Sequence, residues 1–81
     1  MRTFPGLHRI TFNPSVMGGR ACIRGMRITV AHIVNMVANG MTTEEIIKEY
    51  PDLEAEDVRQ SLQYAAFLTR EEIYPTAGSR S

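Results

Sequence analysis

Cysteine is nearly absent from this 81-residue chain, and its scarcity excludes two kinds of site. Cys22 is the single cysteine, so the chain can form neither an internal disulfide nor a zinc site built from several thiolates. This composition fits a reducing compartment, and we expect a cytoplasmic protein. Long apolar runs are missing too. No stretch approaches the roughly 20 apolar residues needed to span a membrane, so no membrane partner is expected. The opening residues MRTFPGLHRI hold no apolar segment long enough for a signal peptide.

Acidic residues are absent from the first 30 residues, which makes the charge of the chain uneven. Residues 1–30 hold five arginines, whereas residues 31–81 hold four basic side chains and all nine acids. The formal charges of +5 and −5 therefore cancel over the whole chain. One interpretation is a basic face for phosphate groups and an acidic face for another partner. The other interpretation is that the two halves attract each other within the fold or across a dimer.

No arrangement of side chains indicates catalysis or metal binding. His8 and His32 each lack a nearby acid or cysteine at metal-ligand spacing. Ser15 and Ser61 lack the sequence context of a serine nucleophile, such as G-x-S-x-G. We therefore predict a protein that is not an enzyme and that needs no metal or cofactor.

The first third of the chain is typical of extended structure. RITF alternates between polar and apolar residues, and the short runs ACI and RIT are joined by RGM, where Gly25 can supply a positive φ. The pattern predicts a small β-hairpin or ribbon over residues 8–30. Such a ribbon is marginal alone and needs helices or a second copy to cover it.

The remainder of the chain carries helical periodicity and helix end signals. Thr29 is a plausible N-cap of a first helix, and Gly40 is a plausible residue to end it. Thr42 and Glu45 form a capping-box pattern at the start of a second helix. Pro51 ends that helix, because the residue before proline is disfavoured in the α conformation.

A third helix is predicted from about residue 55 to residue 72, and its apolar residues define two sides. The predicted core stripe is Val58, Leu62, Ala65 and Ala66. Tyr64 and Phe67 lie nearly opposite this stripe, with Leu68 at the margin, and they predict a partner interface. Ile73 and Tyr74 would extend this interface. A second subunit or a different protein would cover this surface. The alternative is that the β-ribbon folds over the aromatic rings.

Together these elements predict a mainly α protein, in which a short N-terminal β-ribbon precedes a three-helix bundle of helix-turn-helix type. The domain is predicted to span residues 1–74, with the ribbon over 8–30, the bundle over 30–72 and a disordered tail over 75–81. A chain this short buries only about 60–65% of its unfolded surface, so a homodimer is expected.

At this point the segment NPSVMGGRACIRGMRITVAHIVNMVANGMTTEEIIKEYPDLEAEDVRQSLQYA resembles the domain-of-unknown-function family 433. The resemblance rests on the Asn-Pro turn, the Gly-Gly step, the Ile-Arg-Gly-x-Arg-Ile segment and the glycine after the first helix. It also rests on an acidic second helix ending in Tyr-Pro and on the Leu-x-x-Glu-Asp-Val start of the third helix. It covers roughly residues 8–68. The resemblance implies a winged or homeodomain-like helix-turn-helix fold, and the role of antitoxin to a PIN-like ribonuclease toxin.

Arginines of the N-terminal part are the leading candidates for DNA contact. The predicted DNA-binding residues are Arg9, Arg20, Arg24, Arg27, Arg59, Gln60 and Gln63. The ribbon arginines would contact phosphates, which makes binding salt-dependent. The alternative is that Arg24 and Arg27 flank a turn and pair with acids of the second and third helices. A weaker alternative is an anion pocket at Gly18 and Gly19. The carboxylates at the start of the third helix argue against its simplest docking into a groove.

Two functions follow from these observations. The first is a small dimeric DNA-binding antitoxin, which neutralises a PIN-like ribonuclease toxin and autoregulates its operon. The second is a non-catalytic protein–protein interaction module that has the helix-turn-helix shape but binds no DNA. The zero net charge and the acidic start of the third helix favour the second function.

Overall fold

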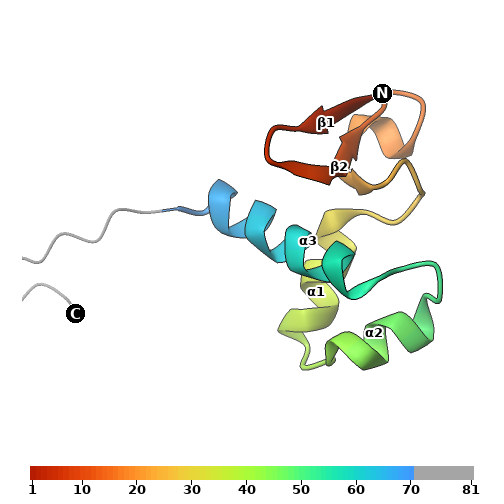
Figure 1. Ribbon diagram of the computed structural model, residues 1–81, viewed down its shortest axis with the longest axis vertical. Helices are drawn as coiled ribbons and strands as arrows, with labels where there is room; N and C mark the ends of the chain where they lie inside the picture. The colour runs from red at the N-terminus through yellow and green to blue at the C-terminus, as the bar shows by residue number, and fades with distance from the viewer. Residues whose placement is uncertain (71–81) are drawn as a thin grey trace, which may run out of the picture.

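The computed structural model describes residues 1–70, which form a small sheet followed by three helices (Figure 1). The strands are β1 (Arg2–Phe4), β2 (Leu7–Phe12) and β3 (Cys22–Ile23), with a 3-10 turn η1 (Met17–Gly19) between the last two. The helices are α1 (Val30–Ala38), α2 (Thr43–Glu49) and α3 (Ala55–Leu68). In Figure 1 the sheet lies at one end of the molecule and α2 at the other, and α3 lies between them. None of the helices in residues 1–70 is long and apolar enough to cross a membrane.

The sheet is antiparallel, with strand order β1-β2-β3. Strand β1 lies outside the predicted ribbon over residues 8–30, so that boundary is wrong at its N-terminal side. The Pro5-Gly6 dipeptide, in which Gly6 has a φ of +83°, turns β1 back onto β2. The predicted strand RIT is also wrong, because Thr29 forms only an isolated bridge to Cys22.

The ends of α1 and α2 confirm the local signals in the sequence. The Thr29 hydroxyl oxygen caps α1 by accepting a hydrogen bond of 3.0 Å from the backbone N–H of His32. Gly40 follows α1 with a φ of +93°, and its N–H donates to the carbonyl of Val37. Thr42 and Glu45 exchange both capping-box hydrogen bonds at the start of α2. Helix α2 ends at Glu49, directly before Tyr50 and Pro51.

Helix α3 begins at Ala55 as predicted but ends at Leu68, four residues earlier than expected. The Thr69 hydroxyl donates back to the carbonyl of Ala65, and Thr69 has left the helical conformation. Residues 71–81, which include the predicted domain boundary at 74 and the predicted tail, lie outside the described residues.

The core lies where the sheet, α1, α2 and the first half of α3 meet. Its buried apolar residues are Ile10, Ile23, Val30, Ile33, Met36, Ile46, Leu53 and Val58. The predicted core stripe of α3 is wrong at Leu62 and Ala66, which are exposed. Asp57 and Gln60 are buried in their place, because α3 turns this polar side toward β2. The fold therefore seals a charged group between the sheet and α3.

Candidate functional site

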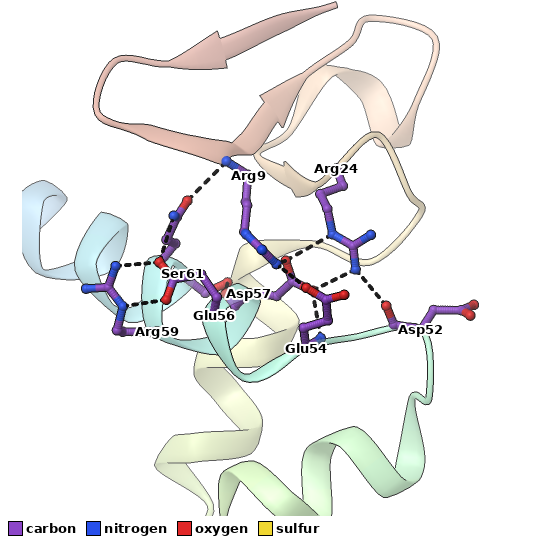
Figure 2. A network of polar contacts seen from close by, with 9 residues as sticks. Arg9, Arg24, Asp52, Glu54, Glu56, Asp57, Arg59 and Ser61 are labelled. Carbon is purple, nitrogen blue, oxygen red and sulfur yellow. Dashed lines mark hydrogen bonds and ion pairs between the residues drawn. The ribbon is translucent and has the colours of Figure 1, made fainter.

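The Asp57 carboxylate has no exposed surface and accepts hydrogen bonds from three directions (Figure 2). The Arg9 Nη1 lies 3.0 Å from Asp57 Oδ1. The Arg24 guanidinium donates from Nε to Oδ1 at 3.1 Å and from Nη2 to Oδ2 at 2.8 Å. The backbone N–H of Glu54 donates to Oδ2 at 2.8 Å. We call Arg9, Arg24, Glu54 and Asp57 the aspartate clamp.

The clamp joins three segments that are far apart in the sequence. Arg9 comes from β2, Arg24 from the turn after β3, and Asp57 from the first turn of α3. Arg24 has a φ of 47°, a conformation that costs about 1 kcal/mol or more for a non-glycine residue. Its backbone N–H donates to the Arg9 carbonyl at 2.8 Å, and its Nη2 donates to the Asp52 carbonyl at 2.7 Å. These bonds hold the turn in a left-handed conformation and aim the guanidinium at α3.

Two opposing effects set the pKa of the Asp57 carboxyl. Burial raises this pKa, because it disfavours the charged form. The hydrogen bonds from Arg24, from the Glu54 backbone and from Arg9 lower the pKa, and together they outweigh burial. The pKa of Asp57 therefore lies below its ordinary value, and the clamp is an ion cluster at neutral pH.

Four of the predicted DNA-binding residues have partners inside the domain. Arg24 pairs with Asp57, as the intramolecular alternative expected, and so does Arg9, which that alternative did not name. Arg27, which it did name, forms no ion pair within residues 1–70. Gln60 is 3% exposed, and its Oε1 accepts the backbone N–H of Arg9 at 3.0 Å. Its position therefore does not support the predicted DNA contact. Arg59 forms an ion pair with Glu56 on the exposed side of α3.

The Glu56 carboxylate also accepts a hydrogen bond of 2.9 Å from the Gln60 Nε2. The bonds from Arg59 and Gln60 lower the pKa of Glu56 to about 2. Glu56 thus joins the surface ion pair to the buried amide, and both lie on α3 beside the clamp (Figure 2).

Arg20, Arg27 and Gln63 remain exposed. Neither Arg20 nor Arg27 forms an ion pair with another residue of the range 1–70. Both lie close to Cys22: burial raises the pKa of the Cys22 thiol, and the positive charges of the two arginines act against that rise. Arg20 precedes β3 and Arg27 follows the turn after it, so both flank this strand.

Gly18 and Gly19 form part of a tight turn. Both have positive φ, at 68° and 84°. The N–H of Gly19 donates to the Val16 carbonyl, and the N–H of Arg20 donates to the Met17 carbonyl. Because turn carbonyls occupy these two donors, the geometry does not support an anion pocket here.

The C-terminal half of α3 carries exposed apolar side chains. Phe4 of β1 packs edge-on against both Tyr64 and Phe67, with ring centroids 5.1 Å apart in each pair. Tyr64 is half-buried under the sheet, as the alternative interpretation expected. Phe67 stays 49% exposed, Leu68 62% and Leu62 38%. We call Leu62, Phe67 and Leu68 the α3 apolar end. Ile73 and Tyr74, the other predicted interface residues, lie outside the described residues.

A groove of about 490 Å³ lies between α3, the start of α1 and the segment before β3. Its apolar lining is formed by Ala21, Val30, Val34, Tyr64, Ala65 and Leu68. Leu68 therefore belongs both to the groove and to the α3 apolar end. Over residues 1–70, no three His, Cys, Asp or Glu side chains are grouped as metal ligands.

From the sequence, Asp57 is only one of the carboxylates at the start of the third helix. Its spacing of three residues from the N-cap Glu54 is the position of a capping-box acid, which was the available signal. Nothing local to Asp57 indicates two arginine partners 48 and 33 residues away.

The fold and these contacts define a small domain of a three-stranded antiparallel sheet and three helices, in which a buried carboxylate joins the sheet to α3. The chain belongs to the family described as "Protein of unknown function (DUF433)", which matches residues 10–65. This agrees with the resemblance found in the sequence.

The chain is also similar to two individual proteins. It is 34% identical over 56 residues to "Uncharacterized protein y4eO" of Sinorhizobium fredii (strain NBRC 101917 / NGR234). The match covers 69% of this chain but only 25% of that protein, so the chain spans about a quarter of its length. A DUF433 member from Anabaena variabilis ATCC 29413, known from a crystal structure, superimposes with a TM-score of 0.68 at 36% identity. That match covers 73% of this chain and 58% of the other.

Proposed function

We propose that this chain is a non-catalytic binding protein and that it acts as the antitoxin to a PIN-like ribonuclease toxin. The observation that carries the protein-binding part is the α3 apolar end, where three large apolar residues are exposed on the last turns of one helix. Residues 64–68 are five successive non-polar residues, so they face every direction around the helix axis. The sheet and α1 can cover only part of such a helix end.

The exposed surface suits a partner that wraps the free side of α3. In Figure 1 the C-terminal turns of α3 extend past α1 and α2. Apolar surface concentrated on one helix is typical of an interaction site, whereas single exposed apolar residues are common on any protein. The nine acids, all after residue 30, complement the basic surface expected of a ribonuclease that binds RNA. The toxin is therefore the partner we assign to this helix end.

Homodimerisation is part of the same proposal. A two-fold pair would use the same patch on both copies. The α3 apolar end is small for a stable dimer, because specific interfaces bury about 800 Å² on each partner. A weak dimer in the free protein, replaced by the toxin complex, fits this size.

Co-purification tests the antitoxin proposal. A tagged chain is expressed together with a PIN-like ribonuclease from the same genome, and the complex is isolated by affinity and size-exclusion chromatography. Phe67→Ser combined with Leu62→Ser should abolish the complex, whereas Gln63→Ala, on the exposed side of the same helix, should leave it intact. The antitoxin role is wrong if the wild-type pair does not associate. Protein binding through α3 is wrong if the double variant binds as tightly as the wild type.

DNA binding is a second candidate, and Arg20 and Arg27 favour it. Both are exposed, and both flank β3 without an acidic partner in residues 1–70. The acids at the start of α3 argue that this helix does not enter the groove N-terminus first, although α2 and α3 have helix-turn-helix order. Two phosphate contacts per protomer predict a shallow salt dependence, with a slope of about −2 in log K against log salt.

A salt titration on the DNA upstream of the chain's own reading frame tests this second function. Arg20→Ala with Arg27→Ala should flatten the slope, whereas Arg59→Ala should leave the slope unchanged, because Arg59 is paired with Glu56. If no binding above the nonspecific level is seen at low salt, the DNA-binding function is wrong and protein binding is the remaining candidate.

A further inference from the structure

The groove beside α3 has the features of a binding site for a short apolar segment. Its volume of about 490 Å³ lies within the usual range of ligand pockets. Its floor is apolar, with Val30 and Val34 on one side and Ala65 and Leu68 on the other. Arg20 is the charged side chain among the described residues that line it, and no acid of residues 1–70 lines it.

The groove lies at the point from which the chain continues beyond the described residues. Thr69 is itself part of the groove lining. Eleven residues follow Arg70, and they begin with Glu71, Glu72, Ile73 and Tyr74. This sequence places two acids directly before two large apolar residues. The acids complement the charge of Arg20, and the apolar side chains complement the apolar lining of the groove.

We propose that this groove binds Ile73 and Tyr74 of the same chain, with Glu71 and Glu72 placed to neutralise Arg20. The chain between Thr69 and Ile73 is long enough to permit this placement. Ile73 comes four positions after Thr69 in the sequence, and an extended chain spans at most about 3.3–3.6 Å per residue, or roughly 14 Å over these four steps. The tethered segment has a high effective concentration, of the order of millimolar for a short linker, so an intramolecular contact is favoured over the same segment from a second molecule.

This inference does not depend on the antitoxin function, because it needs no partner. It accounts for the apolar surface on the α1 side of α3, which includes Leu68. Phe67 and Leu62 remain for the proposed protein partner. The two ideas can therefore fail separately.

Disulfide trapping in the full chain tests the proposal. In a Cys22→Ala background, Ala31→Cys is combined with Ile73→Cys, since Ala31 is exposed at the groove. The matched control combines Ile73→Cys with Ala38→Cys, which is exposed at the opposite end of the same helix. Mild oxidation is followed by thiol counting, intact mass and non-reducing electrophoresis. We expect the 31–73 pair to close within a single chain, the 38–73 pair to stay reduced, and Arg20→Gln to slow closure.

Two results would overturn the proposal. Disulfide-linked dimers of the 31–73 pair would assign the groove to the tail of a second copy. Free thiols in both pairs, or equal closure in both, would show that the tail does not occupy the groove.

An NMR measurement tests the same proposal without introduced cysteines, which could themselves change the position of the tail. In the full chain, Ile73→Ser with Tyr74→Ser should shift the NMR methyl signals of Val30 and Val34. The signal of Ile46, which lies in α2 away from the groove, should stay unchanged. Unchanged signals at all three residues would also contradict the proposal.

Discussion

Replacing Asp57 with asparagine removes one charge from the centre of the aspartate clamp and keeps the shape of the side chain. The amide can still accept a hydrogen bond through its oxygen, but its NH₂ group then faces guanidinium donors. Arg9 and Arg24 lose the carboxylate that Figure 2 shows between them. Arg9 keeps its ion pair with the exposed Glu54 carboxylate at 2.7 Å, whereas Arg24 keeps only its hydrogen bond to the Asp52 carbonyl and loses its carboxylate partner.

Removal of one partner from a buried ion pair costs about 3–5 kcal/mol. The side chains of Arg9 and Arg24 are 22% and 37% exposed, so water can partly solvate the charges that lose their partner. We therefore expect the lower end of this range, about 3 kcal/mol. For a domain of this size the corresponding fall in Tm is about 12–24 °C.

Thermal and urea unfolding followed by circular dichroism measure this effect. Asp52→Asn is the matched control, because Arg24 bonds the backbone carbonyl of Asp52 and the substitution keeps that carbonyl. The control should have the same Tm as the wild type. If Asp57→Asn also melts within about 2 °C of the wild type, the clamp does not hold the sheet to α3.

Comparing the Tm of the wild type with that of Asp57→Asn at each pH isolates the contribution of Asp57 to the pH dependence of stability. The pKa of Asp57 in the folded chain lies below the ordinary value of 3.8. Its stabilising contribution is therefore present above pH 4 and is lost as the pH falls through the folded pKa. The Tm of the wild type should fall toward that of Asp57→Asn as the pH is lowered from 5 to about 3. Parallel curves over this interval would contradict the assignment.

Three further substitutions test the local structure. Gly40→Ala should lower the free energy of unfolding by about 1 kcal/mol, because a φ of +93° strains any residue with a Cβ. No clash adds to this cost, since no atom lies within 4 Å of an added Cβ. Gly40→Asn should recover part of the loss in urea unfolding. Thr42→Ala should cost about 1 kcal/mol by removing the cap of α2, whereas Thr43→Ala should change stability little in the same assay. Arg59→Ala should leave the Tm nearly unchanged, since exposed ion pairs contribute little, but it should raise the pKa of Glu56 from about 2 toward 4.5 in an NMR titration.

The ends of α1 and α2 could be predicted from the sequence because the signals that fix them are local. Thr29 caps through a residue three positions later, and the Gly40 N–H bonds a carbonyl three positions earlier. Pro51 acts on the residue directly before it. Such signals need no knowledge of the tertiary fold, and the observed starts of all three helices agree with them.

The rotation of α3 could not be predicted in the same way. A stripe of apolar residues predicts the buried side only when polar residues have no reason to be buried. Here the Asp57 carboxylate is drawn inward by arginines from β2 and from the turn after β3. Gln60 follows it, because its amide completes the hydrogen bond of the Arg9 backbone N–H. Leu62 is left exposed as a result.

Strand β1 was missed for a related reason. Its three residues are too few to show a period, and the strand is stabilised by pairing with β2 and by the packing of Phe4 on Tyr64. The Pro5-Gly6 dipeptide was the one local sign of a turn. The partner aromatic ring lies 60 residues away, so the sequence pattern could not indicate the contact.

The uneven charge of the chain now has two explanations, each for different arginines. Arg24 and Arg27 are three residues apart, but the turn at Arg24 and Gly25, both with positive φ, sends them to different surroundings. Arg24 reaches the buried Asp57, whereas Arg27 stays exposed beside β3. Internal attraction therefore accounts for Arg9 and Arg24, and binding to phosphate is sought at Arg20 and Arg27, which have no acidic partner in residues 1–70. A loss of nucleic-acid binding in an Arg24 variant would report a damaged fold, and the same loss in an Arg27 variant would report a lost contact.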